Sequence, residues 1–274
     1  MEVLTLYVGQ GNLAVVRHGN EAIVVDTRWL ADRADEIESK VQNFLHQRDL
    51  VGVVLTGLDD DHADPVGLDW LLEEFQPAWI MYPKYYKSTE NARAVFGVIR
   101  KHEVRRRGAW RPLARIAVRL DQLESRHLGD LADEFELELF SPHVEDMDDS
   151  NNCSVVLKVE GVGSGGFAYL VTGDTENPRW DRIVELFDEA LSSDVLAAPH
   201  HGSKDAAHPG MALAVMPDTV LISAGVDNQY GHPHRKAVTL YLRVARRVFK
   251  TNVREGVSFL TWEEGGVFHT RTVR

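Results

Sequence analysis

The first half of the chain alternates short apolar runs with turns that contain glycine and asparagine. Residues 3–8, 13–16, 22–25 and 53–55 have the β-branched, apolar character of strands. Helical spacing of apolar positions follows at 31–46 and 66–75, and each of these helices leads into another apolar strand, at residue 51 and at 78–82. The pattern predicts a β-meander followed by two strand–helix–strand passages.

The second half of the chain repeats this order. Strands are predicted at 136–140, 154–159, 167–171, 195–198 and 219–223, with a helix at 179–191. Two halves of this kind close best as two mixed sheets packed face to face with helices on the outer faces. We therefore predict an α/β fold, an αββα sandwich, formed by a single domain over residues 1–274. Residues 83–131 fit the repeat poorly and are rich in arginine, so this segment is interpreted as a basic insertion or helical excursion.

Composition and charge narrow the class of protein. The hydrophobic fraction is 44% and the charged fraction 26%, as in ordinary globular proteins. We see neither a secretory signal nor an apolar run of about 18–20 residues, so we expect no membrane association. The single cysteine, Cys153, forms no intrachain disulfide, and cytoplasmic localisation is the default. A net charge of −12 argues against sequence-blind coating of nucleic acid.

One basic island interrupts this acidic chain, between Arg100 and Arg119. Its guanidinium groups predict docking of a nucleic-acid backbone, with Trp110 offering an aromatic face for stacking. Two alternatives stay open at this point. The island is also explained as a solvated face that balances nearby acids, or as a contact with a protein partner.

The sharpest chemical signal is a group of three carboxylates and one imidazole directly after an apolar strand. Asp59, Asp60, Asp61 and His62 follow the strand that ends near Leu55. Acidic groups packed so closely repel one another, and a divalent cation relieves that repulsion while using oxygen and nitrogen ligands together. The alternative is an exposed acidic turn that caps the next helix.

Two further clusters stand at strand ends. Asp174 follows Thr172-Gly173, and Gly173 permits a close backbone approach. His200 and His201 enter a loop that contains glycine and serine, where at most one of the two rings is expected to face a metal. With the first cluster these residues predict a shared metal site of carboxylates and imidazoles.

With these motifs the sequence resembles the metallo-β-lactamase superfamily, and within it the hydrolase-like domain of the ComEC competence proteins and their free-standing relatives. The matching segments lie in the right order from residue 8 to residue 233, leaving out the basic island and the last stretch. They are Val8-Gly9-Gln10-Gly11-Asn12, Val25-Asp26-Thr27, Thr56 through His62, Asn151-Asn152-Cys153-Ser154, Thr172-Gly173-Asp174, Pro199-His200-His201-Gly202-Ser203 and Asn228-Gln229-Tyr230-Gly231-His232-Pro233.

The resemblance implies two metal positions. The ligands that it implies for the second position are Asp61, His62, Asp174 and His200. Those that it implies for the first position fall on Gly57, Asp59 and the Asn151-Asn152 region. Because Gly57 has no side chain to offer, we expect one tightly bound divalent metal, zinc or manganese, and a second site that is weak or empty.

One metal suffices for hydrolysis, because a cation polarises a phosphoryl oxygen and lowers the pKa of a bound water to about 7. The expected catalytic residues are Asp61 as a metal ligand, Asp59 to orient or deprotonate the water, and His232 to donate to the leaving oxygen. Asp26 is expected to brace the site from the neighbouring strand by accepting backbone hydrogen bonds. The candidate substrate-binding residues are Asn152, Ser154, His201, Ser203, Lys204 and Asn228.

The leading hypothesis is a metal-dependent hydrolase that cleaves a phosphodiester, in particular a nuclease, because the resemblance is to proteins associated with DNA processing. A second hypothesis, suggested by Gly57, is a catalytically weak pseudo-enzyme that binds a nucleotide or a protein partner. A third is a hydrolase of carboxyl esters, thioesters or lactams, which needs the same activated water. DNA, RNA and small nucleotides are equally compatible with these motifs.

Overall fold

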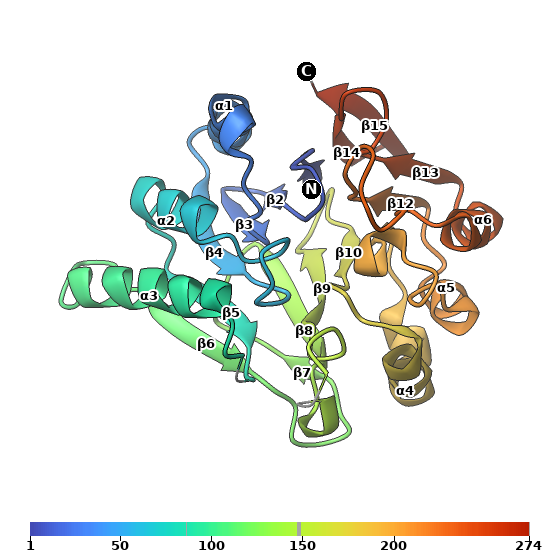
Figure 1. Ribbon diagram of the computed structural model, residues 1–274, viewed down its shortest axis with the longest axis horizontal. Coiled ribbons are helices and arrows are strands. Elements are labelled where there is room, and N and C mark those ends of the chain that lie inside the picture. Colours follow the sequence, from blue (N-terminus) through green and yellow to red (C-terminus); the bar gives the residue numbers. More distant parts are fainter. Residues whose placement is uncertain (86, 147–148, 274) are drawn as a thin grey trace.

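A computed structural model describes residues 1–85, 87–146 and 149–273, and shows two mixed sheets between outer layers of helices (Figure 1). The first sheet has the strand order β15-β14-β1-β2-β3-β4-β5-β6. Its strands are β1 (Glu2–Thr5), β2 (Ala14–His18), β3 (Glu21–Val25), β4 (Asp49–Val54), β5 (Trp79–Pro83), β6 (Ala114–Val118), β14 (Ser258–Glu264) and β15 (Val267–Val273). Strands β3 to β6 run parallel, and the remaining pairs are antiparallel.

The second sheet has the same plan, with the order β13-β12-β11-β10-β9-β8-β7. Its strands are β7 (Arg126–His127), β8 (Phe135–Ser141), β9 (Val156–Gly161), β10 (Ala168–Val171), β11 (Val195–Ala197), β12 (Thr219–Ile222) and β13 (Arg247–Lys250). Strands β10 to β13 are parallel, whereas β7 to β10 are antiparallel. The repeat predicted from the sequence is therefore visible in both sheets.

The helices lie on the outer faces of the sandwich (Figure 1). The first sheet is covered by α1 (Ala34–Leu45), α2 (Pro65–Glu74) and α3 (Glu90–Arg105), and the second by α4 (Asn177–Phe187), α5 (Pro209–Val215) and α6 (Arg235–Val244). Short 3-10 turns are η1 (Ala31–Arg33), η2 (Val144–Asp146), η3 (Asp188–Leu191) and η4 (Pro199–Gly202). This arrangement confirms the predicted αββα fold.

Side chains that alternate along the strands build the layers. In β3, Ala22 and Val24 pack under the helices, whereas Ile23 and Val25 face the second sheet. A strand buried on both faces reads as an unbroken apolar run, as β3 and β4 do. The middle layer joins both sheets, with Val25 and Val54 in the same apolar cluster as Val171.

The segment predicted as a basic insertion or helical excursion, residues 83–131, contains α3 and β6. Strand β6 pairs in parallel with β5 and extends the first sheet, and α3 packs beside α2. The arginine-rich stretch thus lies within a further strand–helix–strand passage, formed by β5, α3 and β6. Across the described ranges no helix combines the length and apolarity needed to cross a bilayer.

Candidate metal centre

The clusters singled out in the sequence meet where parallel strands of the two sheets end. Asp61 and His62 lie in the loop after β4, Asp174 lies three residues after β10, and His201 lies in the turn after β11. Backbone hydrogen bonds hold the first loop against its neighbours: the carbonyl of Asp61 accepts from Asn12, and that of His62 accepts from Thr27. The loop is therefore fixed by segments that are distant in the sequence.

Four ligand atoms, one each from Asp61, His62, Asp174 and His201, lie within 4.8 Å of one another. His62 Nε2 is 2.9 Å from Asp174 Oδ1 and 3.9 Å from Asp61 Oδ1. His201 Nε2 is 3.4 Å from Asp61 Oδ2 and 3.6 Å from Asp174 Oδ1. Ligands bound at 2.0–2.2 Å in a tetrahedron are separated by about 3.3–3.6 Å. The measured separations bracket this value, so the four residues fit one divalent metal.

The hydrogen bonds of the two imidazoles support the same reading. His62 Nδ1 lies 2.9 Å from the fully buried Asp26 carboxylate, and His201 Nδ1 lies 2.9 Å from the Ser223 carbonyl. A carbonyl oxygen only accepts, so His201 Nδ1 carries a proton and Nε2 is the ring atom that faces the cluster. Both Nε2 atoms are buried, and their close polar neighbours are the cluster carboxylates. A carboxylate or carbonyl behind each imidazole is the usual support of a metal-binding histidine.

The charges in the cluster require compensation. Burial by itself would raise the pKa of Asp174, but the adjacent His62 and His201 outweigh it and hold that pKa well below its ordinary value. Burial would conversely lower the pKa of His62, yet the carboxylates of Asp174 and Asp26 raise it. A metal bound here therefore displaces protons from the imidazoles, so its affinity rises with pH.

The two adjacent histidines face different partners. His200 and His201 both adopt left-handed backbone conformations, with φ of 49° and 52°, which are uncommon for residues other than glycine. His201 points into the four-residue cluster, whereas His200 Nδ1 lies 3.1 Å from Glu176 Oε1 and its Nε2 lies 3.8 Å from Asp174 Oδ2. The sequence predicted His200 as the ligand and His201 as a substrate contact; the structure places His201 in the cluster and His200 beside it.

Asp59 is engaged by a residue that the sequence motifs did not indicate. The ammonium group of Lys87, in the loop between β5 and α3, forms an ion pair with the Asp59 carboxylate. Gly57 lies nearby, and a Cβ built on it would stand 3.7 Å from His62 Cγ. Asp59 therefore pairs with a cation of the protein at the first of the two metal positions that the resemblance implies.

A cleft of about 260 Å³ opens over this centre. The residues that line it are Gln10, Asp59, Asp60, Asp61, Ser150, Asn151, Asp174, His200, His201, Tyr230 and His232. The ring of His232 stacks on Tyr230 and on His201, with centroids 5.8 Å and 6.4 Å apart. Burial, followed by the nearby His200, lowers the pKa of His232 to about 4. His232 is thus neutral at pH 7 in the substrate-free protein and offers a hydrogen bond without a charge.

The other predicted site residues mostly brace the backbone. Asp26 accepts hydrogen bonds from the Thr56 backbone N–H at 2.7 Å and from the Thr56 hydroxyl. Ser154 Oγ accepts the Asp174 N–H at 2.9 Å, and Asn228 Oδ1 accepts the His232 N–H at 3.0 Å.

Of the six predicted substrate contacts only His201 lines the cleft; Ser154 and Asn228 lie outside the lining, as do three others. Asn152 Oδ1 accepts the Glu176 N–H at 3.1 Å, Ser203 is buried, and Lys204 is exposed. These positions suggest that Asn152 and Ser203 shape the loops of the site.

Comparison with known proteins gives the family context. The family model described as the metallo-beta-lactamase superfamily matches residues 6–208. ComE operon protein 3 of Bacillus subtilis is 27% identical over 81% of this chain, which covers 26% of that protein. Competence protein ComA of Neisseria gonorrhoeae is 35% identical over 37% of this chain, which covers 14% of that protein. The chain thus spans about a quarter or less of the length of these relatives, and the resemblance seen in the motifs is confirmed.

One solved structure shares the fold over nearly the whole chain. It is a metallo hydrolase from Ignicoccus hospitalis, with a TM-score of 0.52 and 14% sequence identity, and the match covers 96% of this chain and 100% of that one. At this identity the match speaks for the fold alone.

Proposed function

This chain belongs to the metallo-beta-lactamase superfamily, and we propose that it uses one divalent metal to hydrolyse phosphodiester bonds in nucleic acid. The family and the four-residue cluster support a hydrolase of the metallo-β-lactamase fold with a candidate metal site. That its substrate is a phosphodiester is our proposal. The competence relatives support it, because the resemblance to them implies DNA processing.

The observation that carries the proposal is the convergence of buried ligand atoms in the cluster. The Nε2 atoms of His62 and His201 are buried and lie 2.9 Å and 3.6 Å from the buried Oδ1 atom of Asp174. Burying several ionisable groups so close together is costly in a folded protein unless something binds them. Zinc or manganese suits two imidazoles and two carboxylates.

When bound, such a cation polarises a phosphoryl oxygen and promotes ionisation of water near neutral pH. The residues of the chain do the rest. Lys87 places a positive charge beside the cleft, where it attracts the substrate phosphate, and Asp59 holds that ammonium group in place. Neutral His232 donates a hydrogen bond to the leaving oxygen, and the Asn228 side chain fixes its backbone.

A substrate screen tests the proposal. Single-stranded DNA, duplex DNA, RNA and a chromogenic bis-phosphodiester would be compared with a carboxyl ester, a thioester and a lactam, each with zinc and with manganese. We expect turnover of the phosphodiesters. Turnover of only the esters or the lactam would show that the site hydrolyses those substrates and not phosphodiesters. Metal binding without any turnover would favour the pseudo-enzyme suggested by Gly57.

The buried carboxylate behind His62 provides a graded test of the metal site. We expect Asp26→Asn to weaken metal binding by about 10–100-fold, because the amide no longer fixes the His62 tautomer as a carboxylate does. The measurement is a competition titration against a fluorescent chelator. Asp60→Asn is the matched control, since Asp60 is exposed and contacts Arg28. Equal affinities in the two variants would show that Asp26 does not support a metal ligand.

A further inference from the structure

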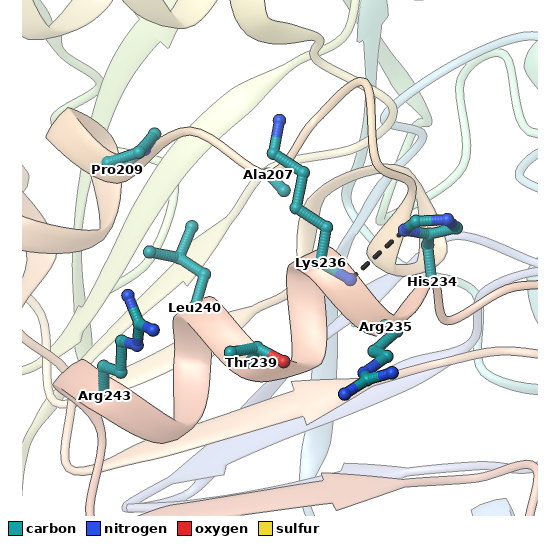
Figure 2. A pocket seen from close by; sticks show the side chains of 8 residues that line it. All are labelled: Ala207, Pro209, His234, Arg235, Lys236, Thr239, Leu240 and Arg243. Atoms are coloured by element: carbon teal, nitrogen blue, oxygen red, sulfur yellow. Dashed lines mark hydrogen bonds between the residues drawn. The ribbon is translucent and has the colours of Figure 1, made fainter.

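A cationic groove runs along α6, beside the loop that follows the cluster residue His201. It is about 480 Å³ in volume, and Figure 2 shows the residues that line it. They are Ala207, Pro209, His234, Arg235, Lys236, Thr239, Leu240 and Arg243. Lys236, Leu240 and Arg243 extend from α6 toward the side where Ala207 and Pro209 lie (Figure 2). Their spacing of four and three residues places them on one face of the helix.

The charge of this groove is unbalanced in a protein whose net charge is −12. Residues 235–250 contain six lysines and arginines and no aspartate or glutamate. Asp218 pairs with Arg246 and Arg247, at 3.8 Å and 3.2 Å. The cations that line the groove, Arg235, Lys236 and Arg243, form no ion pair with any residue that the structure describes. Three uncompensated cations beside one groove are available to an anionic ligand.

The basic island from Arg100 to Arg119 differs in this respect. Lys101 lies 2.7 Å from Asp69, Arg105 pairs with Glu73, and Arg111 lies 2.6 Å from Asp49. Arg106 is buried and donates to backbone carbonyls, among them that of Gln76. Much of the island's charge is therefore used within the fold. That the island docks nucleic acid stays a prediction, and the island has less unpaired charge for it than the sequence suggested.

The groove lies next to the loops that build the metal centre. The N–H of His234, which caps α6, donates to the Gly202 carbonyl at 2.8 Å, and Gly202 directly follows His201. His232, which lines the cleft, precedes His234 by two residues. The loops that carry His201 and His232 therefore border the groove as well as the cleft.

We infer that this groove binds the sugar–phosphate backbone of a single-stranded nucleic acid next to the bond that is cleaved. This inference rests on the proposed function. The groove has the volume of a pocket for a drug-sized ligand, which suits about one or two nucleotides of one strand. Lys236 and Arg243 are separated by seven residues, which is about 10.5 Å along a helix, so both can contact phosphates of the same extended strand.

Binding measurements with matched variants test the inference. The probe is a fluorescently labelled single-stranded oligodeoxynucleotide with phosphorothioate linkages, and its affinity is measured by anisotropy from 50 to 200 mM salt. The variant Arg235→Gln/Lys236→Gln/Arg243→Gln removes three cations from the groove. Arg100→Gln/Arg105→Gln/Arg107→Gln removes the same charge from exposed positions of the island. Unchanged melting temperatures would show that both variants fold.

The groove variant should bind more weakly and with less salt dependence. Each phosphate contact in a single strand contributes about 0.7 to the slope of log affinity against log salt. Over this fourfold range of salt, three phosphate contacts make the affinity of the wild type fall by a further factor of roughly 20. The groove variant lacks these contacts and should not show this part of the decrease. The island variant should keep most of the wild-type slope.

Two outcomes overturn the inference: a groove variant that binds like wild type, or an island variant that loses as much of the salt slope. Equal or tighter binding of a duplex overturns the single-strand assignment. Binding does not require turnover, so the result stands apart from the proposed reaction. If the oligonucleotide binds through the groove and no diester is hydrolysed, the proposed function fails while the groove assignment survives.

Discussion

His62→Ala, Asp174→Asn and His201→Ala will each remove most of the bound metal and lower the rate of diester hydrolysis by more than about 100-fold. Loss of a supporting residue behind a ligand already costs 10–100-fold, and loss of the ligand itself costs more. The three residues present buried ligand atoms to one point, so loss of any one leaves the metal with too few ligands. Metal content by mass spectrometry and turnover of a chromogenic diester measure both effects.

His200→Ala is the matched control for His201→Ala, because the two residues are adjacent and of the same type. His200 lies beside Glu176, outside the four-residue cluster, so the variant should retain its metal. The opposite result, in which His200→Ala loses the metal and His201→Ala keeps it, would contradict the ligand set seen in the structure. It would favour the set that the family resemblance implies.

The second large effect concerns the number of metals. The wild type should bind one metal firmly, because Gly57 provides no ligand and Lys87 occupies the Asp59 carboxylate. Neither Gly57→His nor Lys87→Met alone should add a firm site. The double variant Gly57→His/Lys87→Met provides a new imidazole and frees Asp59, so its zinc content should rise from near one toward two per chain.

The structure allows this double change. The three atoms nearest to a Cβ built on Gly57 all belong to the His62 side chain, at ordinary contact distances of 3.7–3.8 Å. Gly57→His/Lys84→Met is the control, because Lys84 is exposed in the same loop and should leave the zinc content near one. A wild type that already holds two metals firmly, or a double variant that stays at one, would refute the role given to Lys87.

Part of this site was predictable from local sequence. Asp61 and His62 lie in the loop after β4 of the first sheet, and Asp174 lies just after β10 of the second. Their convergence follows from the face-to-face packing of the two sheets, which was predicted from the order of elements. The fold followed from the repeat of strands and helices in the two halves. The fold and the convergence of these ligands were both predictable because each depends on patterns within short stretches of sequence.

The remaining features depend on backbone geometry or on distant segments. Which of His200 and His201 faces the metal is decided by two consecutive left-handed residues, which no spacing rule indicates. Lys87 reaches Asp59 from a loop 28 residues further along the chain. The lysine and arginines of the island looked free in sequence because their partners, Asp49, Asp69 and Glu73, come from β4 and α2. Such contacts appear only when the fold brings these segments together.

The central claim is that one metal at the four-residue cluster drives phosphodiester hydrolysis. The most direct measurement adds zinc or manganese stepwise to metal-free protein while bis-phosphodiester hydrolysis and bound metal are recorded together. We expect activity to rise linearly with bound metal and to level off at one metal per chain. Activity that begins only after the first equivalent is bound, or a protein that fills with metal and hydrolyses no phosphodiester, would contradict the claim.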